Sequence, residues 1–109
     1  MRVLIIGGTG TIGSQAAAAF EELGDEVITV GRSTELSVDL EDPASITEMF
    51  NKVGRVDAVV TAMGSAPFVS IEDATADDFQ AGISGKMLAQ LNAVVYCLPY
   101  LNDLSLIHI

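Results

Sequence analysis

Short apolar runs and longer amphipathic segments alternate along the chain. Apolar runs that end in or before glycine occupy residues 3–6, 26–31 and 56–64, and a further short run covers residues 36–38. Uninterrupted runs of this kind are typical of parallel strands that are buried on both faces. The pattern therefore predicts about four strands.

The segments between the apolar runs carry helix signals with defined ends. Residues 11–23 are rich in helix formers and stop before Gly24, which suits the position just after a helix. A second helix is predicted after Asp42, which can cap its first turn, and Pro43, which fits the first helical position. Gly54 marks the end of this helix.

The last helical segment is the longest and the most apolar. Thr75, with Asp78 three places on, forms the pattern of a capping box. Apolar residues then recur at helical spacing, at Phe79, Ile83, Met87, Leu91, Val94 and Leu98. Strands that alternate with helices predict an α/β, Rossmann-like, doubly wound parallel sheet with right-handed crossovers and helices on both faces. With about four strands over residues 1–103, the sheet is incomplete and corresponds to little more than one mononucleotide-binding half.

Charge and cysteine content narrow the function. The net charge of −10 disfavours nucleic acid and anionic membrane surfaces as partners, and no apolar segment is long enough to span a membrane. Cys97 is the single cysteine, which excludes an intrachain disulfide and a cysteine-rich zinc site. We therefore expect a cytoplasmic protein with no metal site, in which Cys97 is an inert core thiol.

Three glycines follow the first predicted strand. Gly7, Gly10 and Gly13 lie in the turn that opens the first predicted helix, where backbone N–H groups can approach a pyrophosphate. Because Ser14 and Gln15 follow Gly13, the lysine of an NTPase phosphate loop is missing. The glycines alone leave a dinucleotide site and a methyltransferase loop open.

The end of the second predicted strand favours one dinucleotide over the other. An acidic residue about twenty positions after the glycines suits the ribose of NAD, whereas a cation there suits the 2′-phosphate of NADP. Here Arg32 stands 19 residues after Gly13, and Ser33 and Thr34 add hydroxyl donors. This favours NADP over NAD and argues against a methyltransferase.

With these motifs in order, the chain resembles the short-chain dehydrogenase/reductase superfamily from Arg2 to Asp103. The matching stretches are "GGTGTIG", "GRS", "VDLED", "TAMG" and "CLPYLND". By this resemblance Asp39 and Leu40 flank the adenine, and Ala62, Met63 and Gly64 lie beside the nicotinamide ribose. The pyrophosphate contacts fall to Gly7, Thr9, Gly10, Thr11, Ile12 and Gly13, and the 2′-phosphate contacts to Arg32 and Ser33.

The resemblance implies hydride transfer between NADP(H) and a small carbonyl or alcohol substrate, with residues 65–68 lining the substrate pocket. The family's Tyr-x-x-x-Lys pair is absent, because Tyr96 is followed four places later by Tyr100, and Tyr100 by Leu104. Lys86 occupies the position of a catalytic-site asparagine and is the one catalytic candidate. The glycine spacing also resembles that of atypical members, so a non-catalytic NADP-binding sensor remains the alternative.

Two further expectations concern the end of the chain. By the same resemblance the long apolar helix faces a partner subunit, which implies a homo-oligomer of the complete protein; without further strands, exposed apolar surface predicts aggregation. Residues 104–109, "LSLIHI", are open to two interpretations: the beginning of an apolar strand, or a non-native tail similar to a translated transposase mosaic-end adapter. His108 has no cysteine partner and is not a metal-ligand candidate under either.

Overall fold

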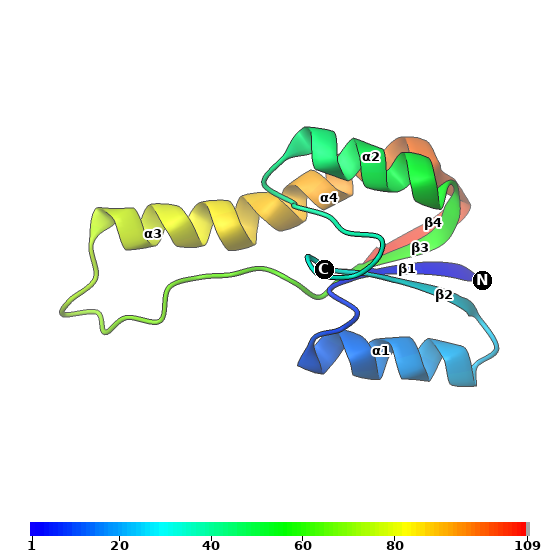
Figure 1. Ribbon diagram of the computed structural model, residues 1–109, viewed down its shortest axis with the longest axis horizontal. Coiled ribbons are helices and arrows are strands. Elements are labelled where there is room, and N and C mark those ends of the chain that lie inside the picture. The colour runs from blue at the N-terminus through cyan, green and yellow to red at the C-terminus, as the bar shows by residue number, and fades with distance from the viewer. Residues whose placement is uncertain (109) are drawn as a thin grey trace.

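The protein is built around a four-stranded parallel sheet (Figure 1). The computed structural model describes residues 1–108; Ile109, the last residue of the 104–109 segment, lies outside them. The strand order is β2-β1-β3-β4, and every neighbouring pair is parallel. The strands are β1 (Arg2–Ile6), β2 (Glu26–Val30), β3 (Val56–Thr61) and β4 (Leu101–His108).

Helices cover both faces of the sheet, as predicted. α1 (Thr11–Glu22) packs on one face, and α2 (Pro43–Val53) and α4 (Ala89–Cys97) pack on the other (Figure 1). Three short elements complete the chain: α3 (Ala76–Gly82), the π-helical turn η1 (Ile83–Leu88) and the 3₁₀ turn η2 (Leu98–Tyr100). The α/β, doubly wound, Rossmann-like fold class is confirmed.

One predicted strand is wrong. Residues 36–38 form only an isolated bridge between Gly31 and Ser37, and the fourth strand is β4 instead. The Thr34 hydroxyl accepts from the Gly31 N–H at 2.8 Å and donates to the Leu36 carbonyl, so the chain turns away from the sheet after one bridge. Val38 is then buried among core residues rather than in a strand ladder.

The predicted helix ends are confirmed. The Asp42 carboxylate accepts from the Ala44 N–H at 3.0 Å, and Gly54 closes the same helix with a φ of +77°. Thr75 and Asp78 form the complete capping box at the start of α3. Side-chain capping replaces the intrahelical hydrogen bonds that the first turn of a helix lacks, so these residues act locally and can be identified from sequence alone.

The long apolar segment is helical but differs from the prediction in two ways. It is not one continuous α-helix, because the turn Ile83–Leu88 is π-helical. Its large apolar side chains are also mostly exposed, whereas the small residues Ala89, Ala93 and Cys97 are buried. Small side chains let α4 lie close to the sheet, and the periodicity of the large ones does not reveal which face of the helix is covered.

The core has two parts, one on each face of the sheet. Alternate residues of β1 supply both, because successive side chains of a strand point to opposite faces. Leu4 and Ile6 pack with α2 and α4, whereas Val3 and Ile5 pack with α1. All four are fully buried, and each such burial contributes roughly 1.5–3 kcal/mol to the free energy of folding.

A network of hydrogen bonds joins the strands at the amino-terminal edge of the sheet, where the parallel strands begin. The Arg2 N–H donates to Asp57 at 2.7 Å, and the Asn102 amide donates to the other Asp57 oxygen at 2.8 Å, so one carboxylate joins β1, β3 and β4. The Arg2 guanidinium donates to the carbonyls of Val53 and Arg55 at the end of α2. The hydrogen bonds from Arg2 and Asn102 lower the pKa of Asp57.

This network makes a prediction about acid stability. A carboxyl whose pKa is lowered by folding stabilises the protein above its unfolded pKa, and that contribution is lost as the pH falls through the folded pKa. At neutral pH, Asp57→Asn should therefore have a lower melting temperature than the wild type. When the pH is lowered below about 4, the melting temperature of Asp57→Asn should fall by less than that of the wild type. Thermal melts from neutral to acidic pH measure both effects, and Glu21→Gln, on the exposed surface of α1, serves as the control. Parallel pH curves for Asp57→Asn and the wild type would contradict the assignment.

Candidate dinucleotide site

The turn between β1 and α1 is held in a conformation that requires glycine. Gly7 has a φ of +91°, and a Cβ at this position would lie 2.8 Å from the backbone of Ala62. A Cβ on Gly13 would overlap the Gly7 carbonyl oxygen. The first turn of α1 therefore lies directly against the end of β1, which no larger residue at these two positions permits.

The amino terminus of α1 has no internal anion. Gly10 is the N-cap residue, no side chain caps the helix, and the first turn contains no acidic residue. Its unpaired N–H groups and the positive end of the helix dipole favour a negatively charged group. Thr9, Gly10, Thr11 and Ile12 are exposed at this turn, whereas Gly13 is buried beneath it.

The glycine turn lies where the strand order reverses. The chain passes from β1 to β2 on one side and then to β3 on the other side of β1. The carboxyl ends of β1 and β3 are therefore adjacent, and Gly7 is packed against Ala62 and Met63 just after β3. Doubly wound folds bind their ligands in the crevice at such a reversal.

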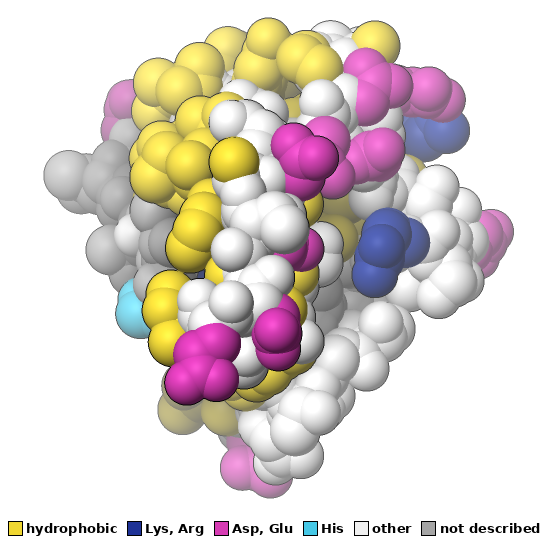
Figure 2. All heavy atoms as spheres, turned by 90° about the vertical axis from the view of Figure 1, so that its left-hand side faces the viewer, with side chains coloured by type: hydrophobic (Ala, Val, Ile, Leu, Met, Phe, Trp, Pro, Cys, Tyr) yellow, Lys and Arg dark blue, Asp and Glu magenta, His cyan; other side chains and the backbone are white. Residues whose placement is uncertain are grey.

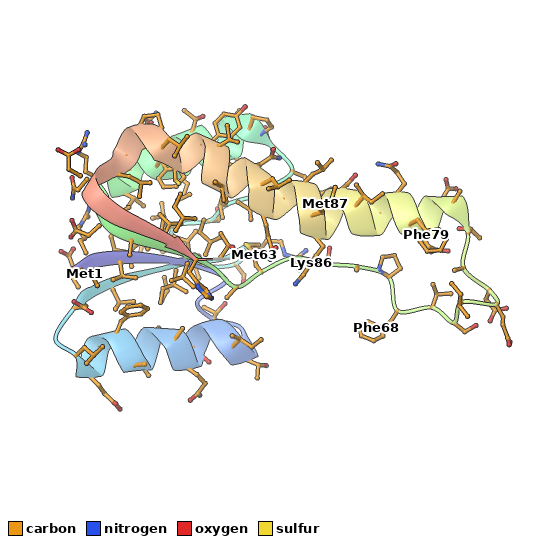
Figure 3. The ribbon with its side chains drawn as sticks, turned by 180° about the vertical axis from the view of Figure 1, so that it is seen from behind. Met1, Met63, Phe68, Phe79, Lys86 and Met87 are labelled. Carbon is orange, nitrogen blue, oxygen red and sulfur yellow. The ribbon has the colours of Figure 1, made fainter. Side chains whose placement is uncertain are left out.

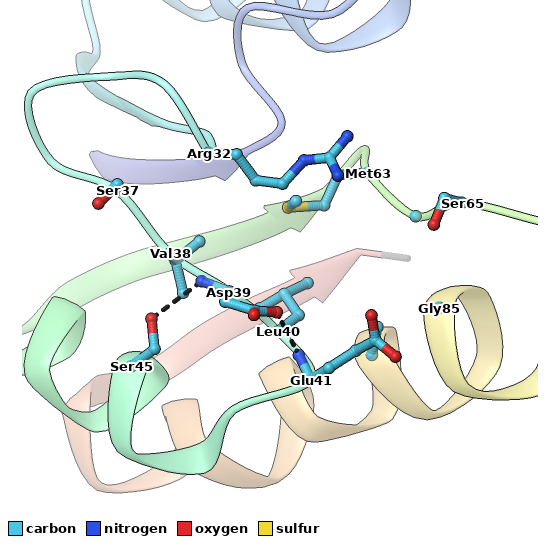
Figure 4. A pocket seen from close by; sticks show the side chains of 12 residues that line it. Arg32, Ser37, Val38, Asp39, Leu40, Glu41, Ser45, Met63, Ser65 and Gly85 are labelled. Carbon is cyan, nitrogen blue, oxygen red and sulfur yellow. Dashed lines mark hydrogen bonds between the residues drawn. The ribbon is translucent and has the colours of Figure 1, made fainter. Parts of the chain in front are cut away.

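Next to this reversal is a pocket of about 490 Å³, which we call the reversal pocket (Figure 4). Three segments enclose it: the turn after β2, the segment that leads into α2, and the loop after β3 with η1 and α4 behind it. Its size is within the range of small-molecule sites. The lining residues are Arg32, Ser37, Val38, Asp39, Leu40, Glu41, Ser45, Met63, Gly64, Ser65, Gly85 and Ala89.

Arg32 reaches into the mouth of this pocket toward Met63 (Figure 4). Its guanidinium makes no hydrogen bond or ion pair within residues 1–108. The turn that carries it is fixed by the Thr34 hydroxyl, which is occupied by Gly31 and Leu36. The Thr34 hydroxyl, which we predicted to donate to a phosphate, is thus used to hold this turn. The Arg32 guanidinium, in contrast, has no such partner within residues 1–108.

Local hydrogen bonds shape the wall opposite Arg32. The Asp39 N–H donates to the Ser45 hydroxyl, and the Glu41 N–H donates to the Asp39 carboxylate, each at 2.9 Å. The Asn92 side chain donates to the Leu40 carbonyl at 3.0 Å, which ties this segment to α4. The wall is therefore built before any ligand arrives.

The structure brings part of the predicted site together in one pocket. Five predicted residues line it: Arg32, Asp39, Leu40, Met63 and Gly64. The glycine turn adjoins it, because the Thr9 hydroxyl lies beside Gly31 and Gly7 lies against Ala62. Ser33 is exposed and does not line the pocket.

Lys86 is on the π-helical turn and projects toward the loop after β3, on the side of Met63 (Figure 3). Its aliphatic stem lies close against Gly64, where a Cβ would be only 2.8 Å from the Lys86 side chain. Gly64 has a φ of +146°, a conformation that favours glycine. Within residues 1–108 the Lys86 ammonium makes no hydrogen bond or ion pair.

Ser65, which we expected with residues 66–68 to line a substrate pocket, lines the same pocket as Arg32. Its contact with Gly85 is a part of the site that we did not predict from the sequence. The Ser65 N–H donates to the Gly85 carbonyl at 2.9 Å, and a Cβ on Gly85 would lie 2.7 Å from the Ser65 carbonyl oxygen. The sequence indicates this contact only through Gly85 itself, because a glycine inside a predicted helix often marks a close packing contact. Ser37, Glu41 and Ser45 carried no signal, because their role depends on where the segment folds.

Three further features of residues 1–108 concern metal ligands, helix length and the single thiol. No group of three or more His, Cys, Asp and Glu side chains lies close enough to hold a metal ion in this part of the chain. None of its helices is both long and apolar enough to cross a membrane. Burial raises the pKa of the Cys97 thiol, which opposes formation of a nucleophilic thiolate.

Comparison with solved structures supports the same fold. The protein lin1944 from Listeria innocua superposes with a TM-score of 0.92 at 38% identity, over 98% of this chain and 54% of that protein. A small-chain dehydrogenase in complex with NADPH gives a TM-score of 0.86 at 23% identity, over 98% of this chain and 48% of the other. A variant of a Serratia marcescens short-chain dehydrogenase/reductase gives 0.80 at 19% identity, over 98% and 55%. No curated protein sequence matches the chain.

The chain spans about half of the length of these solved structures. Its residues 3–93 match the model of the NAD dependent epimerase/dehydratase family. The predicted resemblance to short-chain dehydrogenases is confirmed by this match together with the structural neighbours. The fold, the glycine turn and the family match agree, and the chain belongs to the NAD dependent epimerase/dehydratase family.

Proposed function

We propose that this chain binds NADP, with the pyrophosphate at the glycine turn and the 2′-phosphate at Arg32. The observation that carries the proposal is the Arg32 guanidinium, which has no partner within residues 1–108 and lies at the mouth of the reversal pocket, beside the turn. No acidic residue stands at the end of β2, where one would suit the ribose hydroxyls of NAD. The NADPH named for one structural neighbour is consistent with this choice.

The residues present suit such a cofactor. The α1 amino terminus offers N–H groups without a competing carboxylate, and the close approach of Gly7 and Gly13 leaves the turn open. Asp39 and Leu40 would flank the adenine, and Ala62, Met63 and Gly64 would lie along the path toward the nicotinamide. When bound, the nicotinamide supplies the hydride chemistry.

We further propose that the complete protein is an oxidoreductase that acts on a small carbonyl or alcohol compound. The NAD dependence of the matched family and the dehydrogenases among the structural neighbours support this reaction class. The chain contains the glycine motif but no Tyr-x-x-x-Lys pair. We therefore expect it to supply the cofactor-binding residues of the enzyme and not the residues that transfer the proton. An NADP-binding sensor without catalysis is the alternative, and a serine followed by Tyr-x-x-x-Lys in the complete protein would decide for the enzyme.

Cofactor titration tests the role of Arg32. The wild-type chain should bind NADPH at least about tenfold more tightly than NADH, because a guanidinium paired with a phosphate contributes roughly 1.5–3 kcal/mol. Arg32→Ala should lose this preference and retain NADH binding. Isothermal titration calorimetry of both nucleotides against both proteins measures the difference.

Lys52→Ala provides the matched control. It also removes one positive charge, but Lys52 is on the surface of α2 and pairs with Glu48 at 2.8 Å, remote from the pocket lining. This variant should keep the NADPH preference. Equal binding of NADPH and NADH by the wild type, or an unchanged preference in Arg32→Ala, would contradict the assignment.

A second copy of the chain is the proposed partner, and the cytoplasm is the proposed location. The exposed apolar residues Leu88, Leu91, Val95 and Leu98 follow one another at spacings of three and four, so they form one stripe along the end of η1, α4 and η2. Val95 and Leu98 are 61% and 58% exposed. An apolar stripe of this kind on a soluble domain marks an interaction surface.

Paired substitutions test this surface. Leu91→Lys combined with Val95→Lys should convert a dimer into a monomer, because two charges would face each other across a two-fold axis. Size-exclusion chromatography with light scattering gives the mass, and Glu21→Lys on α1 is the control for added charge. A wild-type chain that remains monomeric at concentrations of tens of micromolar would contradict the proposal, since that range dissociates only weak dimers.

A further inference from the structure

Part of the molecule extends beyond the sheet as an arm (Figure 1). A second pocket lies in this arm. The loop after β3 runs outward and returns as α3 and η1, and this arm gives the molecule a long dimension of 47 Å against 28 and 27 Å in the other directions. Between the loop and the helix is a pocket of about 410 Å³, which we call the arm pocket. Its volume is typical of small-molecule sites.

The walls of the arm pocket are apolar. The loop side contributes Ala66, Pro67, Val69, Ile71 and Ala74, and the helix side contributes Phe79, Gly82, Ile83 and Met87. Figure 2, which looks onto the tip of the arm, shows hydrophobic side chains along one side of it and acidic side chains at the tip. Phe79, Ile83 and Met87 recur every fourth residue, so their side chains lie on one face of the helix.

The two charged residues that line the pocket differ in whether they have partners. Near the tip, the Asp78 carboxylate accepts from the Thr75 N–H at 2.9 Å and from the Thr75 hydroxyl at 2.7 Å, and these hydrogen bonds lower its pKa. Lys86 is eight residues further on, or about 12 Å along the helix axis. Its ammonium has no protein partner within residues 1–108.

An unpartnered cation is unusual in this chain. The sequence has five basic residues against fifteen acidic ones. Arg2, Lys52 and Arg55 are held by carboxylates, carbonyls or an amide oxygen, which leaves Arg32 and Lys86 without partners in the described part of the chain. Arg32 lines the reversal pocket, and Lys86, the other of these two cations, lines the arm pocket.

We propose that the arm pocket binds a small molecule with an apolar body and one carboxylate, and that the carboxylate pairs with Lys86. Apolar walls favour burial of the body, and a charge-assisted hydrogen bond to the ammonium fixes the orientation. Gly64 and Ser65 line the reversal pocket and the Lys86 side chain lies against Gly64, so Lys86 is at the end of the arm pocket nearer to the proposed dinucleotide site. That this molecule is the substrate rests on the proposed function.

The proposed dimer surface is distinct from this pocket. Leu88, Leu91, Val95 and Leu98 do not line the arm pocket, whereas Phe79, Ile83 and Met87 do; the two sets adjoin where Leu91 follows Met87 at a spacing of four. If a second copy of the chain occupied the arm pocket, it would compete with the ligand, and the measured ligand affinity would depend on protein concentration. If the pocket binds only the small carboxylate, the measured affinity does not depend on protein concentration.

A matched pair of ligands tests the proposal directly. Octanoate and 1-octanol have the same chain length and differ in the charge of the head group, and each is titrated into the full chain by calorimetry or ligand-observed NMR. Octanoate should bind about tenfold more tightly than octanol, the gain expected from a charge-assisted hydrogen bond. Lys86→Met, which keeps the length of the stem, should abolish the difference, and Lys86→Arg should restore most of it.

Two further variants separate charge from shape. Lys52→Met removes a lysine outside the pocket and should leave the octanoate preference unchanged. Gly82→Leu should weaken both ligands, because a Cβ at Gly82 faces Ala66 and Pro67 across the pocket at 3.7 and 3.9 Å. Circular dichroism of each variant confirms that the fold is retained.

Three results would overturn the inference: no binding of either ligand, equal binding of both, or a preference that persists in Lys86→Met. An octanoate affinity that falls as the protein concentration rises would show that a second copy competes for the pocket and would equally overturn the inference. NADPH titration of the same protein keeps the two proposals apart. A chain that binds NADPH but fails the octanoate test retains the proposed cofactor and loses only the arm pocket.

Discussion

The close approach of three backbone segments is the constraint on which the rest of the structure depends. Gly7 lies against Ala62, and Gly13 lies against the Gly7 carbonyl, so the ends of β1 and β3 and the start of α1 converge at one point. This convergence is possible only without side chains at positions 7 and 13. It places an uncapped helix terminus at the reversal of strand order, where the fold leaves room for a ligand.

Charge is divided between the two edges of the sheet. At the amino edge, Arg2 and Arg55 are used to join strands and helix ends, and the Asp57 carboxylate binds groups from β1 and β4. At the carboxyl edge, Arg32 and Lys86 have no protein partners within residues 1–108. In a chain with a net charge of −10, these two cations locally offset a negative surface that repels anionic groups. One edge therefore serves stability and the other is suited to ligands.

Local signals in the sequence predicted most of the fold. Apolar runs identified β1, β2 and β3, and the caps at Asp42, Gly54 and Thr75 fixed helix ends, because each depends on residues a few positions apart. The strand predicted at residues 36–38 failed because the Thr34 hydroxyl redirects the chain, a competition that an apolar pattern does not contain. The π-helical turn and the exposure of the long helix also depend on tertiary contacts.

The candidate site was predicted in part for the same reason. Gly7, Gly13 and Arg32 belong to a motif with a physical requirement at each position, and the structure places Arg32 in a pocket that adjoins the turn formed by Gly7 and Gly13. The wall formed by Ser37, Glu41, Ser45 and Gly85 comes from segments far apart in sequence, and only the fold brings them together. The arm pocket likewise joins a loop to a helix, so a list of apolar residues could not reveal it.

The central claim is that the glycine turn and the end of β2 form one dinucleotide site. The most direct measurement is a nitrogen-15 and proton NMR titration of the chain with NADP⁺, followed amide by amide. The account predicts that the largest shifts occur at Gly10, Thr11 and Ile12, and at the backbone and side-chain N–H groups of Arg32. Shifts that are absent, or that are confined to the arm or to the amino edge of the sheet, would contradict it.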